Sequence, residues 1–334
     1  EITGWSGTSV TVTLTYTTVA TYSNRAKVQS TNAAYTDSAY SSTDSIIISS
    51  SITWYGGRGV WAAGHNGGTW VNDISYVAIN TPSNSTDFGN LTQSRAMPGG
   101  CSDGTYGVFG SGHNGNQNTT IDYITISTTG NALDFGDLTV ARSSVGACSD
   151  GTYGVFGGGT SVGGVVNVMD YITIQTTGDA TDFGDLTQSR ASGDACSNGT
   201  RGVFGGGDHL DTLDYVTIAT TSNATDFGNL VTGMNGVASC SDTTRGIFAN
   251  GADPYNDEIE YITIATTGNA LDFGNLTDTR GYFGACSDGT YGVFGGGDGG
   301  RGVLDYVTIQ TLGNATSFGT LSGNRSGTGA CSGD

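Results

Sequence analysis

The stretch that decides the fold is residues 146–190, GACSDGTYGVFGGGTSVGGVVNVMDYITIQTTGDATDFGDLTQSR, because close copies of it fill most of the chain from residue 52 onward. Each copy carries four markers: the Cys of ACS, the aromatic of GVF, the Tyr of DYITI and the Asp of DFG. The Cys markers are Cys101, Cys148, Cys196, Cys240, Cys286 and Cys331, and the aromatic markers are Trp61, Phe109, Phe156, Phe204, Phe248 and Phe294. The Tyr markers are Tyr76, Tyr123, Tyr171, Tyr215, Tyr261 and Tyr306, and the Asp markers are Asp87, Asp134, Asp182, Asp226 and Asp272, with Ser317 in the last copy. The chain is therefore a repeat array.

The spacing between markers separates the constant parts of the repeat from the variable part. The Cys and the aromatic are always 8 residues apart, the Tyr and the Asp 11, and the Asp and the next Cys 14. Only the segment from the aromatic to the Tyr varies, with lengths of 15, 14, 15, 11, 13 and 12 residues along the chain. Such a segment is typical of a solvent-exposed loop that is free to specialise.

The composition favours an all-β protein. The 334 residues include 57 Gly but only 3 Pro, and no apolar run approaches the length of a membrane span. The formal net charge of −19 argues against a nucleic-acid or anionic-membrane partner, because both require clustered Lys and Arg. We therefore predict no nucleic-acid partner and no membrane insertion. Solubility explains the charge, and calcium or salt-rich surroundings are a second explanation.

The cysteines are predicted to be reduced and buried. Their even number follows from one Cys per repeat, so it does not indicate three disulfides. Equivalent positions in neighbouring units of a radial array are expected to lie beyond the ~7 Å Cα separation that a disulfide tolerates. A ring of zinc ligands is disfavoured, because no His or second Cys accompanies any Cys at zinc-site spacing.

Within a repeat we predict four strands, A to D, as in residues 146–190. Strand A is the ACS segment, which turns at Asp-Gly, a strong hairpin signal, into strand B, YGVF. The GGG that follows opens the variable loop, strand C is DYITI, and strand D is FGDLT, which ends at Arg190. Strands this short and closely spaced predict stacked or radial antiparallel sheets.

This pattern resembles the kelch repeat of β-propellers, in which an apolar strand ending in a double Gly is followed by a strand with Tyr and then by one with a large aromatic. GVFGGG, DYITI and DFGDL occupy these places over residues 52–334. Phe replaces the Trp typical of kelch, and Ala249 stands where the first Gly of the pair belongs. The resemblance implies an all-β propeller of four-stranded blades. Residues 261–277, YITIATTGNALDFGNLT, are also similar to repeats in virion and tail-fibre proteins of aquatic bacteriophages.

Residues 1–51 differ from the repeats in residues 52–334. Glu1 is not an initiator Met and no basic-then-apolar leader follows it, so we expect the sequence to begin inside a precursor or after processing. Residues 8–17 alternate strictly, which predicts a half-buried strand, and residues 23–45 are expected to be loops with one or two short strands. We interpret residues 1–51 as an N-terminal Ser/Thr-rich β segment that forms a degenerate blade.

The two ends of the chain are predicted to close the propeller. Residues 53–61, TWYGGRGVW, align without gaps on CSDGTYGVF, so the array holds seven copies of the ACS segment and six of every other segment. The last copy, around Cys331, lacks its partner strands. We predict that it supplies strand A of a blade whose other strands come from residues 1–50, which gives seven blades. Six blades plus a separate N-terminal strand segment is the alternative.

The recurring charged residues and the DFG triplets are interpreted as structural. DFG occurs five times, without the glycine loop, lysine or catalytic loop of a kinase. An Arg recurs at the end of strand D and an acidic residue just before the strand C Tyr, which predicts an internal ion-pair lattice. The Arg positions are Arg95, Arg142, Arg190, Arg280 and Arg325, with Met234 in the remaining copy, and the acidic positions are Asp122, Asp170, Asp214, Glu260 and Asp305.

The variable loops are the candidate binding site. In a propeller whose chain runs from A to D outward, the B-to-C loops and D-to-A connections share one face, and that face carries every length change. The candidate residues are His65, Asn66, Trp70, His113, Asn114, Asp208, His209, Asp253, Tyr255, Asp257, Asp298 and Arg301. The histidines allow a shared metal or a catalytic base, but no acidic spacing recurs beside them, and the aspartates lack a DxDxDG calcium loop. Exposed aromatics such as Trp70 and Tyr255 favour binding.

We therefore predict a non-enzymatic structural or binding module of a phage virion, in a tail, a fibre or a capsid decoration, with virion or extracellular localisation. Its expected partners are other virion or structural proteins, or a cell-surface glycan. No cofactor, metal site or catalytic residue is predicted. The alternative is a propeller enzyme that acts on glycans or as an oxidase, which a convergent set of acid, base or metal-binding residues on one face would favour.

Overall fold

The computed structural model describes residues 2–6, 9–12, 55–249, 251, 256–298 and 301–333. The chain divides into two units, Glu1–Ser51 and Ile52–Asp334. In the first unit, β1 (Ile2–Ser6) and β2 (Ser9–Val12) form an antiparallel hairpin. The strand predicted over residues 8–17 is found as β2, while its second half and the predicted strands in residues 23–45 lie outside the described residues.

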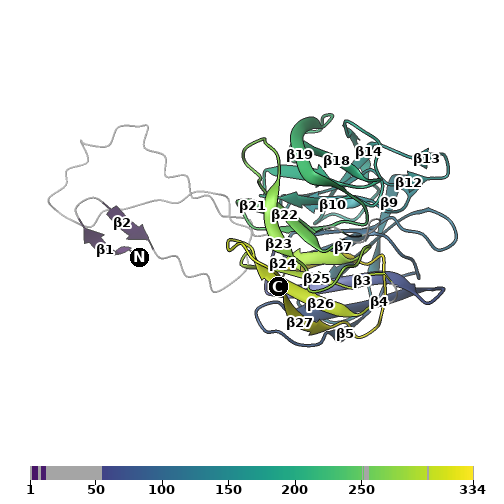
Figure 1. Cartoon of the computed structure of the whole chain (residues 1–334), viewed down its shortest axis with the longest axis horizontal. Helices are drawn as coiled ribbons and strands as arrows, with labels where there is room; N and C mark the ends of the chain where they lie inside the picture. Colours follow the sequence, from purple (N-terminus) through teal and green to yellow (C-terminus); the bar gives the residue numbers. More distant parts are fainter. Residues whose placement is uncertain are drawn as a thin grey trace. The chain divides into compact units, whose positions relative to one another are not determined.

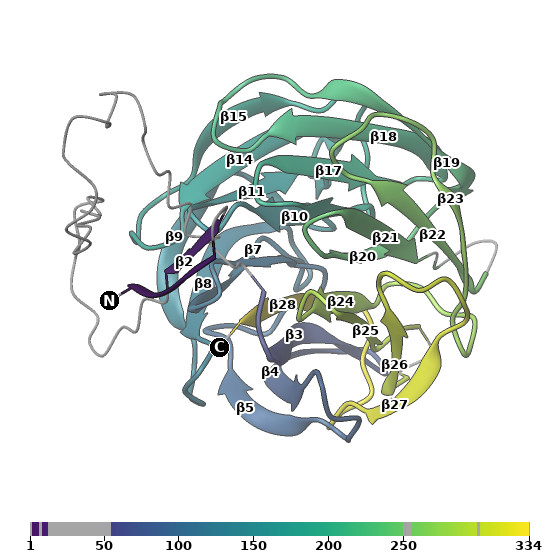
Figure 2. The same cartoon turned by 90° about the vertical axis from the view of Figure 1, so that its left-hand side faces the viewer.

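The second unit is a propeller of six four-stranded antiparallel sheets (Figures 1 and 2). Each sheet is one blade, and its strands pair in the order A, B, C, D. The first three blades are β28 (Gly329–Gly333), β3 (Arg58–Asn66), β4 (Thr69–Ala78) and β5 (Thr86–Asn90); β6 (Gly99–Ser102), β7 (Tyr106–Gly110), β8 (Asn118–Thr125) and β9 (Leu133–Arg142); and β10 (Gly146–Ser149), β11 (Tyr153–Gly157), β14 (Val168–Thr173) and β15 (Thr181–Asp185). The others are β16 (Asp194–Ser197), β17 (Arg201–Gly205), β18 (Leu210–Thr217) and β19 (Thr225–Met234); β20 (Ala238–Ser241), β21 (Arg245–Ala249), β22 (Glu258–Thr263) and β23 (Leu271–Asn275); and β24 (Gly284–Ser287), β25 (Tyr291–Gly295), β26 (Val303–Thr308) and β27 (Thr316–Thr320).

The A strands of neighbouring blades contact one another around the ring and therefore surround its axis (Figure 2). The predicted order of strands A to D is confirmed in every blade. Strand D begins two residues earlier than predicted in the third blade, at Thr181, and its pairing register with strand C shifts at Phe183. The same register shift occurs between strands C and D of every blade, and the Phe that follows each DFG Asp is buried in the core.

The C-terminal strand closes the ring, but with six blades instead of the favoured seven. β28 pairs with β3, which places Cys331 opposite Val60 and Gly333 opposite Arg58. The seven-blade prediction is wrong, because strands B to D of that blade come from residues 58–90 and not from residues 1–50. β28 therefore supplies strand A of the first blade, and the ring closes with six blades.

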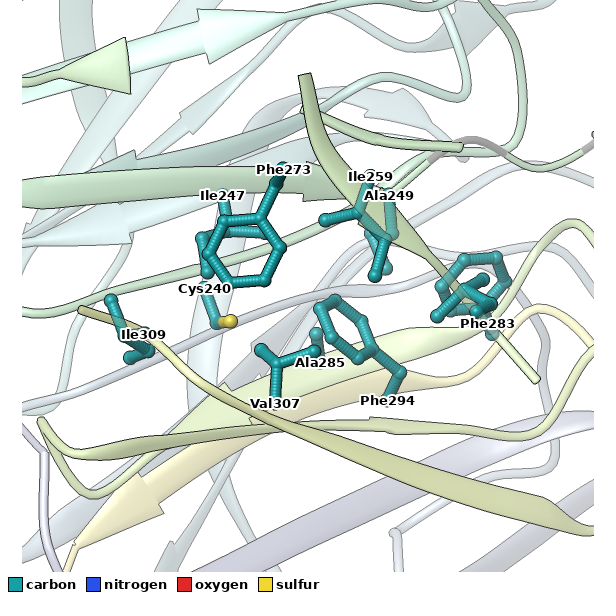
Figure 3. Packing of buried hydrophobic residues seen from close by; sticks show 12 residues of the cluster. Cys240, Ile247, Ala249, Ile259, Phe273, Phe283, Ala285, Phe294, Val307 and Ile309 are labelled. Carbon is teal, nitrogen blue, oxygen red and sulfur yellow. The ribbon is translucent and has the colours of Figure 1, made fainter. Parts of the chain in front are cut away.

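The core lies in the layers between blades, as Figure 3 shows for the fifth and sixth. A four-stranded sheet has two faces to cover, so each blade packs on both neighbours. There Phe294 belongs to one buried cluster with Ile259 and Phe273 of the preceding blade. The six strand B aromatics are all essentially inaccessible to solvent, which confirms the predicted interblade filling. Besides the propeller strands, β12 (Thr160–Ser161) and β13 (Gly164–Val165) form a small hairpin in the B-to-C loop of the third blade.

Candidate functional site

The B-to-C loops and the D-to-A connections lie together, as predicted, and form a surface that we call the loop face. Backbone hydrogen bonds join a loop to a neighbouring connection at several points, for example between His65 and Ser326 and between Ala96 and His113. A similar bridge joins Ser143 to Thr160. Because these bonds anchor the loop bases to the ring, the face is a supported surface on which the variable residues are held.

Three of the candidate residues come together on the loop face. The ring of Trp70 contacts those of both His65 and His113, with centroid separations of 6.1 and 5.6 Å and edge-to-face geometry. His65 and Trp70 are paired across the extended β3–β4 hairpin, while His113 comes from the second blade. All three side chains are half-buried. The cluster therefore spans the boundary between two blades, and Asn66 and Asn114 are exposed at its sides.

The other candidate residues are spread around the ring. Asp208 and His209 are exposed in the fourth blade, opposite the first, and the Asp208 carboxylate accepts a hydrogen bond from the Ala191 N–H at 2.7 Å. Arg301 forms an ion pair with Asp278 in which both side chains remain exposed. Asp257 accepts a hydrogen bond from the Asn275 side chain, and Asp298 lies in the loop of the sixth blade. Asp253 and Tyr255 lie outside the described residues. His209 is therefore not part of the Trp70 cluster.

The opposite face is built from constant turns that fasten each blade to the one before it. In every C-to-D turn an Asn or Asp Oδ1 accepts a hydrogen bond, 3.0 or 3.1 Å long, from a backbone N–H on the preceding strand D or at its end. The acceptors are Asn84, Asn131, Asp179, Asn223, Asn269 and Asn314. The spacing of 11 residues is therefore fixed by a structural contact, which sequence reasoning did not identify.

The predicted ion-pair lattice is confirmed at four of the six boundaries between blades, which we call seams. Each Arg at the end of strand D reaches into the next blade and binds the acidic residue of its strand C. The pairs are Arg95–Asp122 (2.8 Å), Arg142–Asp170 (2.7 Å), Arg190–Asp214 (2.7 Å) and Arg280–Asp305 (2.6 Å). Burial lowers the pKa of Arg142 and raises that of Asp170, so each ion depends on its partner to stay charged. These buried ion pairs join neighbouring blades.

The remaining two seams have opposite defects. Between the fourth and fifth blades Met234 replaces the Arg, and the buried Glu260 carboxylate instead accepts hydrogen bonds from Val231 and Thr232. Between the sixth and first blades the Arg is present but Ser75 replaces the acid, and Arg325 donates to Ser75 Oγ at 2.5 Å. Burial lowers the pKa of Arg325 to about 10, which reflects a cation with no carboxylate in contact with it.

A cavity of about 100 Å³ opens at the axis on the loop face, and sequence reasoning missed it. It is lined by D-to-A connections and by the first residues of the A strands of all six blades. Most lining residues are Gly, Ala or Ser, but Met97, Asp194 and Tyr282 depart from the repeat. The sequence did contain a sign of this cavity, because these three residues differ from their counterparts in the other repeats although the segment between the DFG Asp and the next Cys has constant length.

The chain matches no model of a known protein family, and it matches no curated protein. The structure nevertheless defines the class of protein: a six-bladed, all-β propeller with four-stranded blades and a closure made by its C-terminal strand. Among the described residues, we find no helical segment that could span a bilayer.

Proposed function

We propose that the protein is a non-enzymatic binding module of a phage virion that holds a protein or a cell-surface glycan on its loop face. The observation that carries the proposal is the Trp70 cluster. A half-buried indole in contact with two imidazoles offers an aromatic surface with polar edges, which suits both sugar rings and protein hot spots.

The contrast between constant turns on one face and variable loops on the other supports this proposal. The A-to-B turns of the second to sixth blades and the C-to-D turns of all six are nearly identical, and the C-to-D turns are engaged in contacts between blades. The loops of the other face differ in length and in chemistry. The buried charged groups of the lattice are paired within the structure, which favours binding over acid–base chemistry.

Replacing Trp70 by Ser, alone and together with Tyr255→Ser, tests the proposal. We expect the folded protein to lose at least about tenfold in affinity for its virion partner or for ligands on a glycan array. Leu133→Ser is the matched control, because it removes an exposed apolar side chain from strand D, away from the loops. Binding that survives Trp70→Ser but is abolished by changes in the constant turns would assign the site to the opposite face.

A further inference from the structure

The axial cavity on the loop face contains residues that the fold itself does not require. Its mouth is a ring of six equivalent positions, one from each D-to-A connection, and all six have left-handed backbone conformations. The φ angles are 62° at Met97, 61° at Ser144, 61° at Ser192, 67° at Gly236, 57° at Tyr282 and 64° at Gly327. Neighbouring connections are joined by backbone hydrogen bonds, such as Met97 N–H to Gly327 O at 2.7 Å and Tyr282 N–H to Gly236 O at 2.9 Å.

Four of these six positions carry side chains although the left-handed conformation disfavours residues other than glycine. Glycine occupies the position in two repeats, so the ring geometry forms without a side chain there. Met and Tyr are uncommon in the left-handed region, and residues held in such conformations concentrate at functional sites. Met97 and Tyr282 therefore indicate that side chains are needed at the mouth of the cavity.

A carboxylate stands on the cavity wall where other repeats have none. Asp194 takes the first position of its A strand, which is Gly in four repeats and Ala238 in another. Its Oδ2 accepts a hydrogen bond from the Ser239 N–H at 2.7 Å. Burial raises the pKa of Asp194 to about 6, although hydrogen bonds from the backbone N–H groups of Ala195, Ser239 and Ala147 oppose the rise, so the group is ionised at neutral pH.

No cationic side chain lines the cavity. The lining residues include no Lys, Arg or His, so the Asp194 charge has no balancing partner among them. The cavity of about 100 Å³ has room for about three waters or for a group of similar size. The aromatic ring of Tyr282 and the thioether of Met97 suit contact with methylene groups or with a cation.

We propose that the axial cavity binds a primary ammonium group, carried by a lysine side chain of a partner or by a free alkylamine. Asp194 accepts the ammonium in a charge-assisted hydrogen bond, and Tyr282 and Met97 enclose the adjoining methylenes. The site uses none of the residues of the Trp70 cluster, so it stands or falls independently of the function proposed above.

The test uses the full chain at pH 7.5 and three probes: n-butylammonium, n-butanol as its neutral counterpart, and N-acetyl-lysine amide. We expect saturable binding of n-butylammonium by NMR titration, at least about tenfold weaker binding of n-butanol, and a similar loss in Asp194→Asn. The Asn keeps an acceptor for the Ser239 N–H, so a purely structural Asp194 would leave the titration unchanged. Tighter binding of the lysine amide would indicate a protein partner, and tighter binding of n-butylammonium a free amine.

Tyr282→Gly provides a second variant that is expected to fold. Glycine suits the left-handed position, so its unfolding midpoint should not fall while n-butylammonium binding weakens by about threefold or more. Equal affinity of the wild type and Asp194→Asn, equal affinity for n-butanol and n-butylammonium, or no binding up to about 100 mM ligand would each overturn the proposal.

Discussion

The sulfur of Cys101 occupies the space where a β-carbon on Gly154 of the next blade would stand. A β-carbon there would lie 2.6 Å from the sulfur, and the equivalent contact recurs at all six seams. The other pairs are Cys148–Gly202, Cys196–Gly246, Cys240–Gly292, Cys286–Gly59 and Cys331–Gly107. The Cys of ACS and the Gly of GVF are therefore two halves of one contact between neighbouring blades.

Gly154→Ala should destabilise the protein by about 1–3 kcal/mol, because the added methyl overpacks the seam against Cys101. Cys101→Ala in the same chain should recover much of that loss, since it removes the sulfur that the methyl meets. Urea unfolding measures both, with Gly163→Ala in an exposed turn as the control. Strictly additive effects of the two changes would contradict this account of the contact.

The cysteines should be free and unreactive in the folded protein. All six are unpaired and buried, and burial raises the pKa of every thiol, so the reactive thiolate is scarce at neutral pH. Thiol titration of denatured, unreduced protein should return six groups per chain, and native protein almost none. A denatured count near zero would show that disulfides had formed.

Arg142→Met should cost about 3–5 kcal/mol, because it leaves Asp170 buried without its cation. Met234 shows that a methionine is accommodated at the equivalent position, so the loss reports the missing charge more than the changed shape. The control is Arg301→Met, which breaks an exposed ion pair and should cost no more than about 1 kcal/mol. Similar losses in the two variants would mean that the buried pair contributes little.

Ser75→Asp should stabilise the closing seam by about 1–3 kcal/mol, because it places a carboxylate in contact with Arg325, with which Asp73 and Asp87 interact without forming an ion pair. Ser75→Asn has nearly the same shape without the charge and should gain much less. Denaturant midpoints of the two variants compare them directly. If Asn and Asp behave alike, the Arg325 charge is already compensated by its hydrogen bonds to backbone carbonyls and Ser75.

The stability that Asp194 contributes should depend on pH. Its pKa is raised from 3.8 to about 6 in the folded protein, so the folded state holds this proton more tightly than the unfolded chain. The contribution is therefore complete below about pH 4 and lost as the pH rises through 6. The buried thiols of Cys148, Cys196 and Cys240 face this carboxylate and remain protonated throughout.

Unfolding of wild type and Asp194→Asn between pH 4 and 7 checks this dependence. The stability of the wild type relative to Asp194→Asn should fall by about 1–3 kcal/mol across that range. Parallel stability curves would mean that Asp194 titrates equally in the folded and unfolded states.

The repeat markers predicted the blade, because each marker performs the same contact at every seam. Period-two alternation around Tyr171 and the Gly-rich turns were sufficient for the strand order, and the spacing of Arg190 and Asp214 was sufficient for the ion pairs. Blade number was not predictable in the same way. The similarity of residues 53–61 to an ACS copy suggested a seventh unit, whereas the structure completes the first repeat with β28.

The candidate site was predictable only in part. The face followed from strand order, but the meeting of Trp70 with His113 depends on how loops of different length fold, which no repeat pattern encodes. The axial cavity was missed for the opposite reason. Met97 and Tyr282 lie in segments of constant length, and only the structure shows that these segments meet around the axis in one left-handed conformation.

The pairing of β28 with β3 also bears on how the protein reaches its native state. Val60 and Cys331 are separated by almost the whole array, so β3 exposes an unpaired edge until the sixth blade has been synthesised. Partly synthesised chains therefore expose the unpaired backbone N–H and C=O groups of β3 beside the uncovered indole of Trp61. Two such chains can pair with each other through these groups before either ring closes. Ring closure is a late, long-range step, and slow or crowded synthesis should favour dimers linked through exchanged β28 strands.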